Sequence, residues 1–241
     1  MLLQWLVLAL VLLMIAADHF IVWQAFIRQS QVDATNARHT LWLRDALLMW
    51  AASTLVMWLW IATGVPMSSV GFSLPEGWRL WVPLAATIAF ATLQASSAIK
   101  VARLPAPGEK LRAQLGGVAA IFPRAASELP AFFGVSLTAG FCEELLFRGF
   151  LIWVLQPLVG LWPAAVLSAL LFGAAHAYQG PAGVIRTGLF GLVFTAIVLL
   201  TRSLWPAILL HAVVDAMGGV LAWLVLRDSV PTSPAAEASG S

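Results

Sequence analysis

Residues 130–156 read PAFFGVSLTAGFCEELLFRGFLIWVLQ. The stretch is long and apolar enough to cross a bilayer, because a membrane-spanning helix takes about 20 mostly apolar residues. Near its middle, however, it carries three charged side chains, Glu143, Glu144 and Arg148. A charged group at membrane depth costs at least about 2.5–3.5 kcal/mol, so such groups face the interior of a bundle, pair with one another and mark function. The stretch therefore predicts a transmembrane helix that carries a buried polar site.

The composition extends this prediction to the whole chain. Of its 241 residues, 61% are hydrophobic and only 10% are charged, whereas a soluble domain carries about 25% charged residues. Further apolar runs of near membrane length are 2–27, 43–64, 79–99, 162–178, 184–201 and 206–226. We therefore expect an all-α fold, a polytopic bundle of about seven transmembrane helices in contact with the lipid bilayer.

This pattern divides the chain into three parts. We expect residues 1–128 to contain three N-terminal transmembrane helices with their connecting loops, and residues 129–227 to form a four-helix membrane core that carries the buried polar site. Residues 228–241 have the composition of a disordered tail. The first apolar run lacks a basic flank and is longer than the roughly 7–15 apolar residues of a signal-peptide core, so we expect it to be retained as a span.

The basic residues indicate an orientation rather than a nucleic-acid partner. The net charge is only +2, and the basic residues are scattered over the predicted loops instead of forming a stripe. Cytoplasmic loops hold an excess of Lys and Arg. With the N-terminus outside and the C-terminus in the cytoplasm, as expected for a plasma (inner) membrane protein, only Arg79 and Arg202 lie outside. The ten residues placed inside are Arg28, Arg38, Arg44, Lys100, Arg103, Lys110, Arg112, Arg124, Arg186 and Arg227.

Helix geometry separates the three charged residues of the fourth span. Glu144 and Arg148 are four residues apart with the acid first, which places them on one face in the favourable order for an ion pair. Glu143 is rotated by about 100° from that face and is left without this partner. The ion pair could be purely architectural, which leaves Glu143 as the candidate for chemistry.

Two histidines and one aspartate add to this group. The fifth predicted span ends in Phe172-Gly-Ala-Ala-His176, and the seventh contains His211 and Asp215, four residues apart on one helix face. A lone buried histidine can be a simple hydrogen bond between two helices. The convergence of these side chains with Glu143 from three of the last four spans favours an active site over structure alone.

The three motifs together resemble those of the CAAX prenyl endopeptidase type II group, also called the CPBP or ABI family of intramembrane proteases. The family's motifs are EExxxR, FxxxH and, most often, HxxxN, and the resemblance covers about residues 130–226. Each motif alone is weak, whereas the ordered trio is specific. The matching residues are Glu143, Glu144 and Arg148, then Phe172 and His176, then His211 and Asp215.

The resemblance implies a mechanism and a class of substrate. Glu143 and His176 would activate a water for attack on a peptide carbonyl, and His211 with the residue four positions later would stabilise the oxyanion. The substrate would be a membrane-associated protein or peptide, and neither its identity nor its prenylation follows from the residues. The implied structural support comes from Glu144, Arg148 and Phe172.

Asp215 departs from the family's usual asparagine, and an ionised carboxylate has no hydrogen to donate to an oxyanion. It could be protonated, it could orient His211, or it could be a metal ligand. Two histidines with carboxylates suit a zinc ion that keeps an open position for water. If a metal is present, the expected ligands are Glu143, His176 and His211; no cofactor is otherwise indicated.

A single site must overcome a difference in depth. Leu-Trp-Pro-Ala occurs at residues 161–164 and again at 204–207, and proline suits the first turn of a helix. If both starts lie at one membrane face, His176 is 13 residues beyond Pro163 and His211 is 5 beyond Pro206, a mismatch of about 12 Å. The seventh helix must then begin inside the bundle, or a helix must be tilted or broken. Imidazoles more than about 12 Å apart would contradict a single site.

Two other functions remain open at this point. Intramembrane glutamate and histidine side chains also serve as proton relays in transporters, although a transporter would show repeated halves with broken helices, of which the short repeat above is the only trace. A non-catalytic membrane scaffold could keep an inherited site. The scaffold predicts that alanine variants of Glu143 or His176 retain full biological activity.

Overall fold

The computed structural model describes residues 2–17, 21–104, 112–113 and 115–227. The predicted disordered tail, residues 228–241, lies outside the described residues. Every regular element in the described part is helical. The elements are α1 (Leu2–Ala17), α2 (Trp23–Ser30), α3 (Ala34–Ala62), η2 (Met67–Val70), α4 (Trp78–Ala102), η3 (Gly116–Ile121), η4 (Ala126–Glu128), α6 (Leu129–Glu143), η5 (Glu144–Leu151), α7 (Ile152–Val159), α8 (Leu161–Ala175), η6 (Ala177–Gln179), α9 (Gly180–Thr201) and α10 (Trp205–Leu226).

The predicted all-α membrane bundle of about seven spans is confirmed. Within the described residues, five helical stretches are long and apolar enough to cross a membrane, and α1 and α8 are shorter apolar helices. Large apolar side chains cover the outer faces, as expected where lipid replaces water as the solvent. The five long stretches are Ala34–Ala62, Trp78–Ala102, Ala126–Val159, Ala177–Thr201 and Trp205–Leu226.

Two predicted boundaries are corrected. The run 2–27 appears as two helices, α1 and α2, on either side of residues 18–20, which lie outside the described part. The next helix begins at Ala34 rather than at residue 43. Its early start has a local cause, because the Asp33 side chain accepts a hydrogen bond from the backbone N–H of Asn36 at 2.9 Å and caps the helix.

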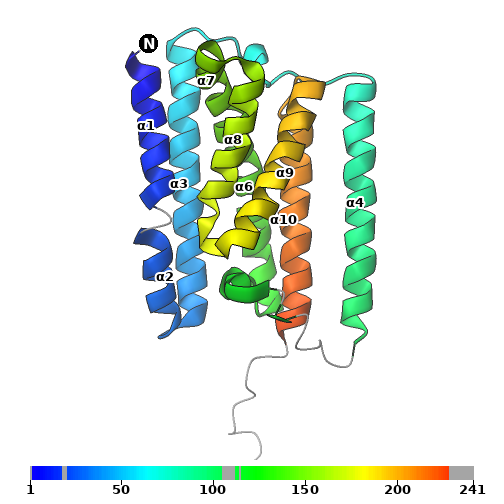
Figure 1. The fold of residues 1–241 in the computed structure, drawn as a ribbon. Coiled ribbons are helices and arrows are strands. Elements are labelled where there is room, and N and C mark those ends of the chain that lie inside the picture. The colour runs from blue at the N-terminus through cyan, green and yellow to red at the C-terminus, as the bar shows by residue number, and fades with distance from the viewer. Residues whose placement is uncertain (1, 18–20, 105–111, 114, 228–241) are drawn as a thin grey trace, which may run out of the picture.

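The helices stand side by side, and α8 and α9 form an inner hairpin (Figure 1). In the view of Figure 1, α1 and α2 lie end to end beside α3, and α4 stands at the opposite edge. Helix α6 packs between α3 and α10, and α10 also packs against α4. The turn between α8 and α9 lies well above the lower end of the bundle in this view, so both helices meet inside the molecule.

The predicted fourth span is the centre of the bundle. It runs through α6, η5 and α7, and its η5 segment is a π-helix, a form that is rare and frequent at functional sites. All eight residues of η5 are buried. The apolar ones form the main hydrophobic core with side chains of α1 and α3, including Val56 and Trp60, neither of which is exposed.

A close crossing of α6 and α10 positions the two halves of the site. A Cβ atom at Gly140 would lie 2.9 Å from the backbone nitrogen of Ala212, so only glycine allows this approach. Small residues at membrane helix crossings serve this purpose, because they let two backbones come together. The crossing brings His211, which precedes Ala212, next to Glu144, one turn beyond Gly140.

Candidate active site

The predicted ion pair between Glu144 and Arg148 is confirmed. Glu144 Oε1 lies 2.9 Å from Arg148 Nη1, and both side chains are completely buried. Arg148 also connects this segment to α9, because its Nη2 donates to the carbonyl oxygen of Gly191 at 3.1 Å and its Nε to Thr195 Oγ1 at 3.4 Å. The guanidinium lies 4.2 Å from the ring centroid of Phe172 on α8. The pair therefore holds η5, α8 and α9 together.

Glu144 has a second partner, which the sequence reasoning missed. His211 Nδ1 lies 2.8 Å from Glu144 Oε1, the same oxygen that accepts from Arg148. Because a carboxylate only accepts hydrogen bonds, His211 Nδ1 carries a hydrogen and donates it. No pattern in the sequence joins two residues on separate helices, so this contact could be found only in the folded chain.

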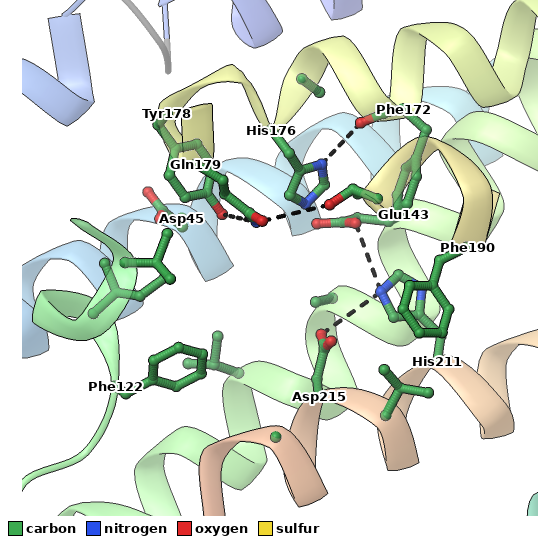
Figure 2. A pocket seen from close by; sticks show the side chains of 18 of the residues that line it. Asp45, Phe122, Glu143, Phe172, His176, Tyr178, Gln179, Phe190, His211 and Asp215 are labelled. Atoms are coloured by element: carbon green, nitrogen blue, oxygen red, sulfur yellow. Dashed lines mark hydrogen bonds and ion pairs between the residues drawn. The ribbon is translucent and has the colours of Figure 1, made fainter. Parts of the chain in front are cut away.

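The other nitrogen of His211 faces the two remaining carboxylates (Figure 2). His211 Nε2 lies 3.8 Å from Glu143 Oε2 and 3.6 Å from Asp215 Oδ2. The proximity of His211 and Asp215 that their spacing predicted is thereby confirmed. The ring is also held by Phe194, which stacks on it with centroids 4.7 Å apart. His211 thus has a fixed orientation with three carboxylates around it.

His176 approaches the same place from the end of α8. It follows the last residue of the helix, and its Nδ1 lies 2.8 Å from the carbonyl oxygen of Phe172. Since a carbonyl only accepts, Nδ1 donates, and in a neutral ring Nε2 keeps its lone pair. Figure 2 shows this second nitrogen pointing toward Glu143. Phe172, predicted as a support, is buried between the two imidazoles and the guanidinium of Arg148.

The two histidines lie close together despite the difference in depth that the sequence predicts. The ring centroid of Phe172 lies 4.9 Å from that of His176 and 5.8 Å from that of His211, so the two imidazoles lie within about 11 Å of each other, inside the limit set by helix rise. Trp162, near the start of α8, is 71% exposed, whereas Leu204, before α10, is 0% exposed. Leu204 is covered by the connection between α3 and α4, because its N–H donates to the carbonyl oxygen of Gly71 at 2.8 Å.

Glu143, His176, His211 and Asp215 line one cavity of about 820 Å³. Its walls come from α1, α2, α3, α4, α6, α8, α9 and α10, and they are mostly apolar, which suits the apolar parts of a membrane-associated substrate. The structure therefore brings together the four side chains to which the sequence assigned catalytic roles. The roles themselves remain predictions.

The zinc hypothesis has a geometric test. Among the described residues, no group of three or more His, Cys, Asp or Glu side chains has an arrangement that could hold a metal ion. Nδ1 of His211 binds Glu144 and Nδ1 of His176 binds a backbone carbonyl, so Nε2 of each ring is the nitrogen that could face an ion. The zinc hypothesis therefore stays a prediction, and we derive no catalytic step through a metal.

The structure adds to what the sequence indicates for Arg186. The sequence placed this residue on the cytoplasmic side, and it lies on α9, close to the inner turn that joins α8 to α9, and lines the cavity. The physical reason is that α8 ends at Ala175 and does not reach the lower end of the bundle (Figure 1). Arg186 therefore belongs to the surroundings of the site.

A family model matches the part of the chain that carries the site. The match covers residues 125–217 and therefore includes all three motifs. It overlaps the predicted core of residues 129–227, whose limits remain a prediction. The comparison with curated proteins found no match, and neither did the comparison with solved structures. The resemblance is thus confirmed over residues 125–217, where this integral membrane protein is similar to the type II CAAX prenyl endopeptidase Rce1-like family of proteases.

Proposed function

We propose that this protein is an intramembrane endopeptidase of the CAAX-processing type, which hydrolyses a peptide bond of a membrane-associated protein or peptide. The observation that carries the proposal is the convergence of Glu143, His176 and His211 on one apolar cavity. A purely structural role would require only the buried ion pair of Glu144 and Arg148. The additional groups at the cavity wall are a base, a second proton acceptor and a donor, which are the parts that peptide hydrolysis requires.

The proposed reaction begins with a water held between Glu143 and His176 Nε2. The carboxylate of Glu143 takes a proton from the water while the water oxygen attacks the peptide carbonyl carbon. The C–O bond forms while the carbonyl oxygen becomes an oxyanion. When the C–N bond breaks, the departing nitrogen takes the proton from Glu143 and leaves as an amine, so the carboxylate is regenerated.

His211 is the proposed donor to the oxyanion. Glu143, Glu144 and Asp215 surround its ring, and these carboxylates stabilise the doubly protonated imidazolium. In that form Nδ1 donates to Glu144, and Nε2 donates to the oxyanion. Such a donor is typically worth about 3–4 kcal/mol of barrier in a water-poor site. Glu144 acts as the residue that positions His211, which gives the brace a direct part in the geometry of the site.

His176→Ala should lower cleavage at least about 100-fold, because the water loses one of its two acceptors. The measurement uses purified protein in lipid nanodiscs and a fluorogenic peptide whose farnesylated cysteine is followed by three residues. A thermal melt of each variant shows that the protein is folded. Unchanged cleavage in a folded His176→Ala variant would exclude the proposed mechanism. Undiminished biological activity of a variant that has lost cleavage would favour the membrane scaffold.

Asp215→Asn should retain activity within about tenfold, whereas Asp215→Ala should lose about 100-fold. The reason is that Asp215 is proposed to orient His211 through the contact at 3.6 Å. An asparagine of nearly the same shape can still lie against Nε2 and leave its N–H to the oxyanion, and the carboxylates of Glu143 and Glu144 still stabilise the imidazolium. Steady-state kinetics on the same peptide compare the two variants. If asparagine is as damaging as alanine, the negative charge itself is required, as it would be for a metal ligand, and zinc analysis of the purified protein follows.

We also propose that the N-terminus lies outside and the C-terminus in the cytoplasm of a plasma (inner) membrane. The excess of Lys and Arg in loops on one side supports this orientation even after Arg186 is removed from the count. Figure 1 shows the start of α1 and the end of α10 at opposite ends of the bundle, as the proposal requires. Labelling of the two termini from either side of sealed vesicles tests it.

A further inference from the structure

One face of α4 lines the cavity, although the rest of this helix faces outward. The residues on that face are Phe90, Gln94, Ser97 and Val101, whose spacing of three or four places them in one stripe along the helix. Large apolar side chains cover the outer faces, as does Leu93, which is 66% exposed. Gln94 is thus a polar side chain on a membrane-spanning helix, and it lies at the cavity rather than against lipid.

The side-chain amide of Gln94 forms no hydrogen bond within the described part of the chain. The neighbouring Ser97, by contrast, is satisfied by its own helix, because its hydroxyl donates to the carbonyl oxygen of Leu93 at 3.0 Å. A polar side chain at membrane depth that makes no hydrogen bond costs free energy, and in membrane bundles such side chains bond across to another helix. Since Gln94 has no such bond, we expect its partner inside the cavity.

Gly218 on α10 leaves an open space at the same cavity. A Cβ atom at this glycine would meet nothing within 4 Å, whereas one at the next residue, Gly219, would collide with the Phe132 ring. Packing between helices therefore explains Gly219 but not Gly218. Glycine in the middle of a helix is destabilising relative to alanine, and one of its uses is to let a ligand approach the backbone closely. Because Gly218 lines the cavity, the space beside it is open to a substrate.

Gln94 and Gly218 lie at a similar depth on neighbouring helices. Helices α4 and α10 pack against each other and run in the same direction (Figure 1). Helix α10 begins beside the connection that leads into α4, because Trp205 Nε1 donates to the carbonyl oxygen of Phe72 at 3.2 Å. Gln94 is 16 residues beyond the start of α4, and Gly218 is 13 beyond the start of α10. These positions are about 24 Å and about 20 Å along the two helices, so both residues belong to one level of the cavity.

This level lies next to the proposed catalytic centre. Gly218 follows Asp215 by three residues, so the two share a face of α10 and are about 4.5 Å apart along its axis. One or two residues of extended peptide, at about 3.3–3.6 Å each, cover that distance. A peptide unit carries an N–H and a carbonyl oxygen, and the amide of Gln94 both donates and accepts. An isoprenoid or acyl chain can do neither, so the chemistry of Gln94 fits the main chain of a peptide.

We propose that Gly218 and Gln94 bind the main chain of the peptide substrate beside the scissile bond. The main chain lies over Gly218, and one peptide unit exchanges hydrogen bonds with the side-chain amide of Gln94. The inference rests on the proposed function, since it concerns how the same cavity holds its substrate. It makes both residues substrate-binding residues with no part in bond breaking. Their substitution should therefore raise KM much more than it lowers kcat.

Affinity measurements with matched controls test the two residues. Fluorescence anisotropy of a labelled farnesylated peptide follows binding to the Glu143→Gln protein in phosphatidylcholine nanodiscs, a parent chosen so that the peptide stays intact. Gln94→Leu and Gly218→Val should each weaken binding at least about tenfold, because a hydrogen bond is lost or the space is filled. Affinity equal to that of the parent in either variant contradicts the inference.

The controls are Gln156→Leu and Gly134→Val, the same changes at exposed positions on α7 and α6 that do not line the cavity. A Cβ atom at Gly134 also meets nothing within 4 Å, so the two glycines match in the space around them. Both controls should change the affinity by less than about twofold.

Stability distinguishes a binding role from a structural one. Unfolding of Gln94→Leu should need at least as much denaturing detergent as unfolding of the parent, because leucine is a good helix former and suits a helix in lipid. The same holds for Gly218→Val, because the space beside the glycine is open. Lower stability of both variants would mean that they act by disturbing the helices, and would overturn the inference.

An ester scan tests the main chain itself. In each peptide one backbone N–H is replaced by an ester oxygen, which removes a donor without adding bulk. One position should lose about tenfold in affinity for the parent and not for Gln94→Leu. The inference is wrong if no position depends on Gln94, or if the variants weaken binding of farnesylated cysteine, which has no peptide unit, as much as that of the peptide. A Gln94-dependent position in a protein whose wild type cleaves none of these peptides would support the inference and contradict the proposed function.

Discussion

Glu143→Gln should lower the rate of peptide cleavage by about 1,000-fold or more while the protein stays folded. Glutamine has nearly the same shape, but its amide cannot take a proton from water. The carboxylate lies at the cavity wall, with its Oε2 3.8 Å from Nε2 of His211. Loss of the base removes the attacking step, whereas the change leaves the apolar packing around it in place. The variant should therefore bind the substrate without cleaving it.

The same variant can identify the natural substrate. Peptides that co-purify with Glu143→Gln and not with the wild type would be trapped substrates, and mass spectrometry would give their sequences. The matched control is Glu76→Gln, the same substitution at an exposed residue of the connection between α3 and α4. Substantial turnover by Glu143→Gln would mean that another group is the base.

Arg148→Met should destabilise the protein by about 3–5 kcal/mol, the second large effect we expect. The substitution removes the guanidinium from the Glu144 carboxylate at a position that has no exposure and leaves it with the contact to His211. The variant also loses the hydrogen bond from Arg148 to Gly191 and the contact of the guanidinium with the Phe172 ring. Unfolding by a denaturing detergent, followed through tryptophan fluorescence, measures the change.

A double variant separates the charge from the packing. Arg148→Met combined with Glu144→Gln should recover part of the loss, because the core then no longer holds a carboxylate that has lost its guanidinium. Arg44→Met is the control, since the Arg44–Asp45 pair is partly exposed with N and O 3.6 Å apart and should contribute less than about 1 kcal/mol. If Arg148→Met is no worse than Arg44→Met, the buried pair is not the brace that we describe.

Much of the fold could be predicted because membrane helices are determined by local composition. A segment in lipid must satisfy its own backbone, so an apolar run of sufficient length has few alternatives to a helix. The predicted spans correspond to helices for this reason. The boundaries were less accurate where a local side chain intervenes, as Asp33 does by capping α3 nine residues before the predicted start.

The contacts of the site that could be predicted are those between residues on the same helix, because their spacing in the sequence determines whether they meet. Glu144 with Arg148, and His211 with Asp215, meet because residues four apart share a helix face, and helix geometry is the same in every protein. The three motifs also indicated the family, whose model matches residues 125–217. Membrane insertion, these pairs and the identity of the candidate catalytic side chains were therefore determined by the sequence itself.

Only the tertiary structure decided which helices meet and at what depth. The contact of Glu144 with His211 depends on the close crossing at Gly140, and the depth of His211 depends on the connection that covers Leu204. Arg186 reaches the cavity because α8 ends inside the bundle. These contacts join residues far apart in the chain, and packing between helices sets them, so no periodicity along one helix could reveal them.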